Sequence, residues 1–169
     1  MLNYTCTFPG SQGIVTAPIN DKLRDSVYPE VFKVLRLAGM VQNRDWEYDK
    51  QARELRIIPS RTTIFFRTTE HPYNLAGPTL AWFWMDEARN SPYEAFTELH
   101  GTLRQQGFPR QAWVTSTPRG KKHWLRRLFD REGYNRDYPD EALPPPVLGE
   151  YRTYQAPTRD NPYGGYQLY

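Results

Sequence analysis

The sequence lacks the usual features of secreted and membrane proteins. It has a single cysteine, Cys6, which excludes a disulfide within the chain and fits a reducing compartment. No apolar run approaches the roughly 20 residues that a membrane-spanning helix needs. Residues 1–10 also lack the basic start and apolar block of a signal peptide. We therefore expect a soluble cytoplasmic protein without a membrane partner.

Negative charge is missing from one long stretch. The net charge of +3 is only mildly basic and identifies no partner. Between Glu98 and Asp130, however, there is no acidic residue. The cations in this stretch are Arg104, Arg110, Arg119, Lys121, Lys122, Arg126 and Arg127. A solvated basic face and a surface for anions or nucleic acid both remain open.

Short apolar runs alternate with helical patterns along the chain. The runs predict buried strands at residues 13–17, 62–67, 80–86 and 112–116, a hairpin over 44–59 and a last short strand over 150–155. With 169 residues, no internal repeat and no composition boundary, the chain predicts a single domain. Alternating strands and helices favour an α/β layered fold with a mainly parallel sheet.

Three helices are expected between these strands. Apolar residues at every fourth position predict a helix over residues 20–37, which Pro29 kinks or divides. Ser91 as N-cap, Pro92 in the first turn and Glu94 as the capping-box partner predict a second helix over 92–104. An amphipathic helix without a cap is expected over 121–131, followed by a polar, Pro-rich loop over 130–146.

Two adjacent carboxylates, Asp86 and Glu87, end the apolar stretch LAWFWMDEA. Ligands of open α/β sheets bind beyond the carboxyl ends of strands. Mg²⁺ accepts one or two carboxylates and leaves its other positions to water and phosphate. A second acid can then orient or deprotonate a water. This pattern is typical of the Walker B element of P-loop ATPases, although a turn with two solvated acids would look the same.

A hydroxyl-rich turn follows the next predicted strand. Thr115, Ser116 and Thr117 come directly after the apolar run 112–114 and are followed by Pro118. Hydroxyls in this position can hydrogen-bond a phosphate or an attacking water, although ordinary turns also use Ser, Thr and Pro. Two polar strand ends separated by a helix favour a nucleotide site.

The order of these motifs resembles the ATPase domain of the large terminase subunit of tailed bacteriophages, the motor that packages DNA into a procapsid. The likeness rests on GIVTAPINDKLRDSVYP, FFRTTEHPYNLAGPTLAWFWMDEA, VTSTPRGKKHW and APTRDNPYG, which together extend over residues 13–164. The resemblance implies a three-layer P-loop NTPase-like fold of the ASCE type, with a mainly parallel sheet and flanking helices. It also implies ATP and Mg²⁺ as cofactors. The implied partners are double-stranded DNA, the small terminase subunit, the portal or procapsid and further copies of the subunit.

The resemblance also implies roles for individual residues. Asp86 matches the Walker B aspartate that holds Mg²⁺ through water, and Glu87 matches the catalytic glutamate. Thr115, Ser116 and Thr117 match the coupling motif that links loss of the γ-phosphate to movement on DNA. Four further positions match the family pattern without an assigned role: Thr158, Asp160, Asn161 and Pro162. The candidate DNA or phosphate contacts are Arg119, Lys121 and Lys122.

The sequence departs from the family in three ways. It contains no GxxxxGK[ST] motif, so we expect a partial ATPase domain over residues 1–169 that lacks the P-loop strand and helix and is inactive alone. It shows no second acidic cluster that would indicate a nuclease. Ala76 stands where relatives often have a candidate arginine finger, and Arg67, Arg89 and Arg119 are possible substitutes.

Three alternatives remain open at this point. Asp86, Glu87 and Arg89 also resemble the DExx box of helicases, although the Thr-Ser-Thr-Pro-Arg-Gly element fits terminases better. The basic stretch and the missing P-loop would suit a non-catalytic DNA-binding or assembly module. A prophage remnant without function is the third alternative.

Overall fold

The computed structural model describes residues 2–117, 120–144 and 152–154. Contacts divide the chain into two compact units, Met1–Thr117 and Pro118–Tyr169. The boundary falls where the sequence showed no change of composition. The expectation that residues 1–169 form one partial ATPase domain stays a prediction.

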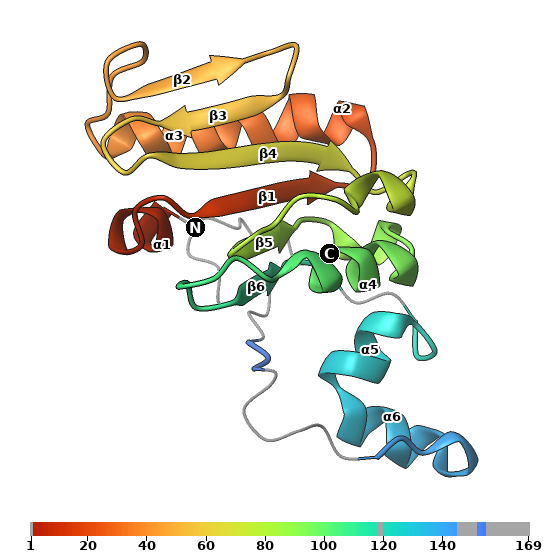
Figure 1. The fold of residues 1–169 in the computed structure, drawn as a ribbon. Coiled ribbons are helices and arrows are strands. Elements are labelled where there is room, and N and C mark those ends of the chain that lie inside the picture. The colour runs from red at the N-terminus through yellow and green to blue at the C-terminus, as the bar shows by residue number, and fades with distance from the viewer. Residues whose placement is uncertain (1, 118–119, 145–151, 155–169) are drawn as a thin grey trace. The chain divides into compact units, whose positions relative to one another are not determined.

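A six-stranded sheet in the order β2-β3-β4-β1-β5-β6 forms the centre of the first unit (Figure 1). Strands β4, β1, β5 and β6 are parallel to one another, while β2, β3 and β4 pair antiparallel. The mainly parallel α/β sheet expected from the sequence is therefore confirmed. The strands are β1 Gln12–Ala17, β2 Trp46–Asp49, β3 Glu54–Ile57, β4 Thr62–Thr68, β5 Trp82–Met85 and β6 Gln111–Val114.

Helices pack on both faces of this sheet, because neighbouring residues of a strand point to opposite faces. In β5, the Trp82 ring lies 6.3 Å from the ring of Tyr4 in helix α1, Leu2–Thr7. The next residue, Phe83, lies 6.0 Å from Phe96 in helix α4, Tyr93–Thr102. The sheet is thus the middle of three layers, with its buried strands covered on both sides.

The long helix after β1 is interrupted just before Pro29. It consists of α2 (Asn20–Lys22), a π-helical turn (Leu23–Val27) and α3 (Tyr28–Leu37). Proline has no N–H for the carbonyl four residues earlier, so the regular hydrogen-bond ladder cannot pass through this point. The residues of the predicted apolar stripe are all buried: Leu23, Val27, Val31 and Leu35.

The predicted capping box of α4 is wrong. The helix begins at Tyr93, and Pro92 precedes it without a side-chain cap. Ser91 is buried, and its hydroxyl lies 2.7 Å from the Thr69 hydroxyl, within hydrogen-bonding distance. The Ser91 hydroxyl thus lies beside Thr69, which follows β4, and does not cap the helix. Two 3₁₀ turns, Pro72–Leu75 and Ala88–Asn90, flank β5 in the chain.

The second unit contains two short helices where the sequence predicted one helix and a loop. Helix α5 spans Trp124–Phe129, and α6, Arg131–Asp137, begins directly after Asp130. The Asp130 carboxylate accepts the N–H of Gly133 at 3.2 Å and so caps α6. His123 caps α5, since its ring nitrogen accepts the N–H of Leu125 at 3.3 Å. A 3₁₀ turn, Pro139–Glu141, comes after α6.

Two sequence predictions fall largely outside the described residues. Of the strand predicted over residues 150–155, only 152–154 are described, and these three are not in a strand. The stretch with Thr158, Asp160, Asn161 and Pro162 lies outside the described part. Among the helices that are described, none has the length and apolar character needed to cross a membrane.

Candidate functional site

The carboxyl ends of the four parallel strands meet at one edge of the sheet. Asp86 follows β5, and its backbone N–H donates to the carbonyl of Thr16 in β1 at 2.9 Å. Thr115 follows β6, and its N–H donates to the carbonyl of Met85 at 3.0 Å. The parallel ladder thus continues one residue beyond the strands and sets Asp86 and Thr115 side by side.

Asp86 is held by a short chain of hydrogen bonds. The Thr115 hydroxyl donates to Asp86 Oδ1 at 2.7 Å, and the Trp84 indole N–H donates to Thr115 Oγ1 at 2.8 Å. The second carboxylate oxygen of Asp86 makes no hydrogen bond with any residue that the structure describes. One oxygen is therefore oriented by the protein, and the other is available to a ligand.

Glu87 has an unusual backbone conformation. Its φ is 49° and its ψ 40°, in the left-handed region that non-glycine residues rarely adopt. Strain of this kind is found at functional sites, where the surrounding structure enforces it. Glu87 Oε2 lies 3.3 Å from Arg89 Nε in an ion pair, yet this buried oxygen accepts no hydrogen bond from the described residues. The carboxylate is thus half-buried and only partly satisfied.

The two loops at this edge are tied together by Ser116. Its hydroxyl accepts the N–H of Arg89 at 2.9 Å and donates to the carbonyl of Thr117 at 3.1 Å. The Ala88 N–H also donates to the Thr115 carbonyl at 3.1 Å. The segment after β6 therefore braces the strained turn at Glu87. The side chain of Thr117 is exposed and makes no hydrogen bond among the described residues.

Sequence reasoning missed two residues of this edge, Trp84 and Thr16. Thr16 is fully buried in β1 opposite Met85, and its hydroxyl has no hydrogen-bond partner among the described residues. Trp84 looked like one more apolar residue of β5. No sequence signal distinguishes either residue, because its role depends on which strand lies beside it.

Two of the predicted basic contacts pair with acids of their own unit. Lys121 and Lys122 belong to the second unit, where they pair with Asp137 at 3.6 Å and Glu141 at 2.9 Å. The Lys122 ammonium also lies over the Tyr138 ring at 4.8 Å. Arg119 is outside the described residues.

Two of the proposed substitutes for an arginine finger have contacts within the unit. The Arg67 guanidinium donates to the carbonyls of Phe66 at 2.8 Å and Ala52 at 3.2 Å, so it holds the end of the β2–β3 hairpin. Arg89 pairs with Glu87, as described above. No observation of this structure assigns either residue to a neighbouring subunit's site.

The donor set at the edge fits a magnesium ion that completes its coordination with other ligands. Within residues 2–117, 120–144 and 152–154, no group of three or more His, Cys, Asp or Glu side chains could hold a metal. Mg²⁺ needs only one or two carboxylates when water and phosphate oxygens supply the remaining positions. The open oxygen of Asp86 meets this requirement.

Several solved structures with the same fold are large terminases. The Thermus phage P74-26 large terminase ATPase domain is 26% identical, with a TM-score of 0.57 over 73% of this chain and 53% of that one. The large terminase of a second, thermophilic bacteriophage is 15% identical, with a TM-score of 0.66 over 78% of this chain and 32% of that one. The HK97 bacteriophage large terminase is 12% identical, with a TM-score of 0.54 over 76% and 27%. The chain thus spans between about a quarter and a half of these proteins.

Sequence comparison points to the same family. A comparison with curated proteins gave no match. The family model of the phage terminase large subunit matches residues 14–163, which is most of the chain. This match and the shared sheet do not favour the helicase alternative. The chain belongs to the phage terminase large subunit family, and its first unit has the fold of the terminase ATPase.

Proposed function

We propose that the chain contributes the Walker B and coupling elements of a phage DNA-packaging ATPase. The observation that carries the proposal is the 2.7 Å hydrogen bond from Thr115 to Asp86, because it joins the two strand ends at which these motifs were expected. The large terminase of the thermophilic bacteriophage has been solved with ADP and with ATP-gamma-S, so nucleotide binding occurs in a protein of this fold.

Asp86 and Glu87 take different roles in this proposal. When bound, Mg²⁺ with ATP neutralises charge on the β- and γ-phosphates. Asp86 would hold the ion through the oxygen that Thr115 leaves open. Glu87 orients the attacking water and accepts its proton, and the left-handed backbone at this residue sets the direction of its carboxylate.

The segment after β6 serves as the coupling element in the same proposal. Thr115 touches Asp86, and Ser116 touches the backbone of Arg89, so a shift of this segment reaches both acids at once. Thr117 lies next in the chain, with its side chain exposed. The roles of Arg119, Lys121 and Lys122 as DNA or phosphate contacts belong to this proposal as well.

The family suggests the wider setting. We propose that the complete motor acts on double-stranded DNA in the cytoplasm of the infected host, as an assembly of several copies. The small terminase subunit and the portal of the procapsid would be its protein partners. These proposals rest on the family match alone.

The test measures steady-state ATP hydrolysis by the protein that the longest open reading frame containing these residues encodes. Glu87→Gln should lower kcat at least ~100-fold, because general-base catalysis contributes that much, while a fluorescent ATP analogue still binds. The matched control is Glu94→Gln, which changes an exposed carboxylate of α4 outside the site and should leave kcat unchanged. A Glu87→Gln protein with the kcat of the parent would refute the assignment.

The 169-residue chain by itself should not hydrolyse ATP. It contains no GxxxxGK[ST] motif, whose backbone N–H groups and lysine cradle the phosphates. ATP turnover by the isolated chain that Glu87→Gln abolishes would contradict this expectation while supporting the role of Glu87. Reading the genomic DNA upstream of Met1 in the same frame would show whether those codons exist.

A further inference from the structure

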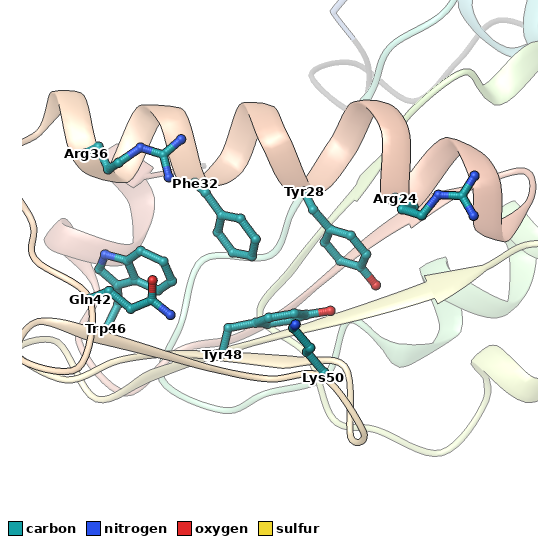
Figure 2. A pocket seen from close by; sticks show the side chains of 8 residues that line it. All are labelled: Arg24, Tyr28, Phe32, Arg36, Gln42, Trp46, Tyr48 and Lys50. Atoms are coloured by element: carbon teal, nitrogen blue, oxygen red, sulfur yellow. The ribbon is translucent and has the colours of Figure 1, made fainter.

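A pocket of about 350 Å³ lies between helix α3 and the β2–β3 hairpin, on the antiparallel side of the sheet and apart from Asp86 (Figure 2). Its lining combines aromatic and cationic side chains, with Gln42 as the remaining member. No role that we assign to the strand-end site uses these residues. The pocket therefore calls for an explanation of its own.

The helix side of the pocket is one stripe of four residues. Arg24, Tyr28, Phe32 and Arg36 follow one another at intervals of four, which places them along one side of the helix. The Tyr28 and Phe32 rings are nearly parallel, with centroids 6.1 Å apart. Two aromatic rings thus lie in the middle of the stripe, with a guanidinium at each end. Figure 2 shows both rings directed from the helix toward the hairpin.

The hairpin side of the pocket also carries aromatic side chains. Trp46 and Tyr48 alternate along β2 and face the helix, where the Phe32 ring lies 5.2 Å from each of them. Trp46 is buried and forms the floor, whereas Tyr48 is half-buried. The acids of the same strand, Glu47 and Asp49, occupy the alternate positions and point to the opposite face. Negative charge from β2 is therefore kept out of the pocket.

The cations of the pocket differ in their availability. Arg24 is paired with Asp21 at 3.2 Å and Asp25 at 2.7 Å. Arg36 and Lys50 have no ion-pair partner within the part of the chain that the structure describes. Burial, followed by a hydrogen bond with Tyr28, raises the pKa of Tyr48, so its phenol stays neutral and adds no negative charge. The pocket thus offers neutral rings beside positive charge.

We propose that this pocket binds a segment of single-stranded DNA, with bases against the aromatic side chains and phosphates on Arg36 and Lys50. Positively charged grooves with aromatic platforms bind single strands in this way, because every base has a face that stacks. An acidic peptide would neutralise the cations but would leave the half-exposed rings of Tyr28, Phe32 and Tyr48 without a base to stack on them. The proposal does not rest on the ATPase assignment of Asp86 and Glu87.

The length of the stripe favours a strand over a free nucleotide. Arg24 and Arg36 are twelve residues apart, or about 18 Å along a helix. One mononucleotide is too short to contact both ends. A chain of several nucleotides can place phosphates on Arg36 and Lys50 and extend its bases along the rings toward the ion-paired Arg24.

The test is fluorescence anisotropy of the 169-residue chain with a labelled ten-nucleotide oligo-dT, titrated at several salt concentrations. Arg36→Glu and Lys50→Glu should each weaken binding, and the loss of one phosphate contact should reduce the salt slope by about 0.7. The matched control is Lys33→Glu, an exposed residue of the same helix that does not line the pocket. Lys33→Glu and Glu87→Gln should leave the affinity unchanged.

A second variant tests the aromatic part. Phe32→Leu keeps an apolar side chain at a half-buried position and should weaken binding roughly fivefold or more through lost stacking. Circular dichroism melts establish whether each variant is folded. If Phe32→Leu does not fold, the binding of Arg36→Glu and Lys50→Glu tests the proposal without it.

Five results would overturn the proposal. Arg36→Glu and Lys50→Glu could bind as the parent does, or Lys33→Glu could lose as much affinity as they do. A duplex of the same length could bind as tightly as the single strand. Poly-aspartate could displace the oligonucleotide at equal charge, which would indicate an acidic peptide site. dTMP could compete as well as the oligomer does, which would indicate a site for free nucleotides.

Discussion

Replacing Gly13 with alanine should destabilise the first unit by about 3 kcal/mol or more. Gly13 lies in the central strand β1 opposite Trp82 of β5. A Cβ added at Gly13 would lie 2.0 Å from Trp82 Cε2 and 2.2 Å from Cζ2. Carbon atoms in ordinary contact are about 3.5–4.0 Å apart, so the ring or the strand would have to move by about 1.5–2 Å.

This displacement has no room, because Trp82 is fully buried between layers. Overpacking a core costs about 1–3 kcal/mol when side chains shift slightly, and a fused ring beside a central strand belongs at the upper end. Since domains of this size are stable by only about 5–15 kcal/mol, the loss would be easy to measure. With a urea slope near ~2 kcal/mol per molar, the unfolding midpoint should fall by about 1.5 M.

Urea unfolding followed by tryptophan fluorescence measures the effect, since every tryptophan except Trp124 lies in the first unit. Gly101→Ala is the matched control. Gly101 lies in α4 with nothing within 4 Å of its added Cβ, so alanine should stabilise by up to about 1 kcal/mol. The same substitution, glycine to alanine, should therefore lower the free energy of unfolding at Gly13 and raise it at Gly101. Equal midpoints for the two variants would refute the packing argument.

Two further predictions concern the edge site and the second unit. Thr115→Val removes the hydroxyl that donates to Asp86 and should lower kcat about tenfold in the reading frame used above; an unchanged kcat would show that this contact is dispensable. The Arg126 guanidinium lowers the pKa of Asp137, so the stability that this pair contributes is present above the unfolded pKa near ~4 and is lost as pH falls through the lower folded value. Asp137→Asn should therefore flatten the fall of the second unit's urea midpoint below about pH 4, and parallel midpoint curves for that unit would contradict this.

Much of the fold could be predicted because its signals are local. The apolar runs of β1, β4, β5 and β6 stand out from polar flanks, and the four-residue spacing from Leu23 to Leu35 marks one helix face. Prediction failed where a local signal met a tertiary competitor. Ser91 has the sequence of an N-cap, yet its hydroxyl lies beside Thr69.

The candidate site divides in the same way. Asp86, Glu87 and the hydroxyl turn from Thr115 onward could be predicted because polar residues at the end of a buried strand are conspicuous in sequence. Trp84 could not, since its indole donates to Thr115 only after β5 and β6 have paired in register. The left-handed backbone conformation of Glu87 likewise could not be predicted from the sequence, because residues that are its neighbours in space impose it.

The order of apolar and polar residues was enough to place the parallel strands and the two acids at a strand end. It was wrong on the burial of 112–116, because β6 lies at the edge of the described sheet and its residues are exposed or half-buried. What those residues touch depends on the folded chain. The Thr115–Asp86 hydrogen bond and the aromatic pocket beside α3 each join residues that are distant in the sequence. The physical reason is that hydrogen bonds and packing act over a few ångströms, and the pairing of strands alone brings such residues within that range.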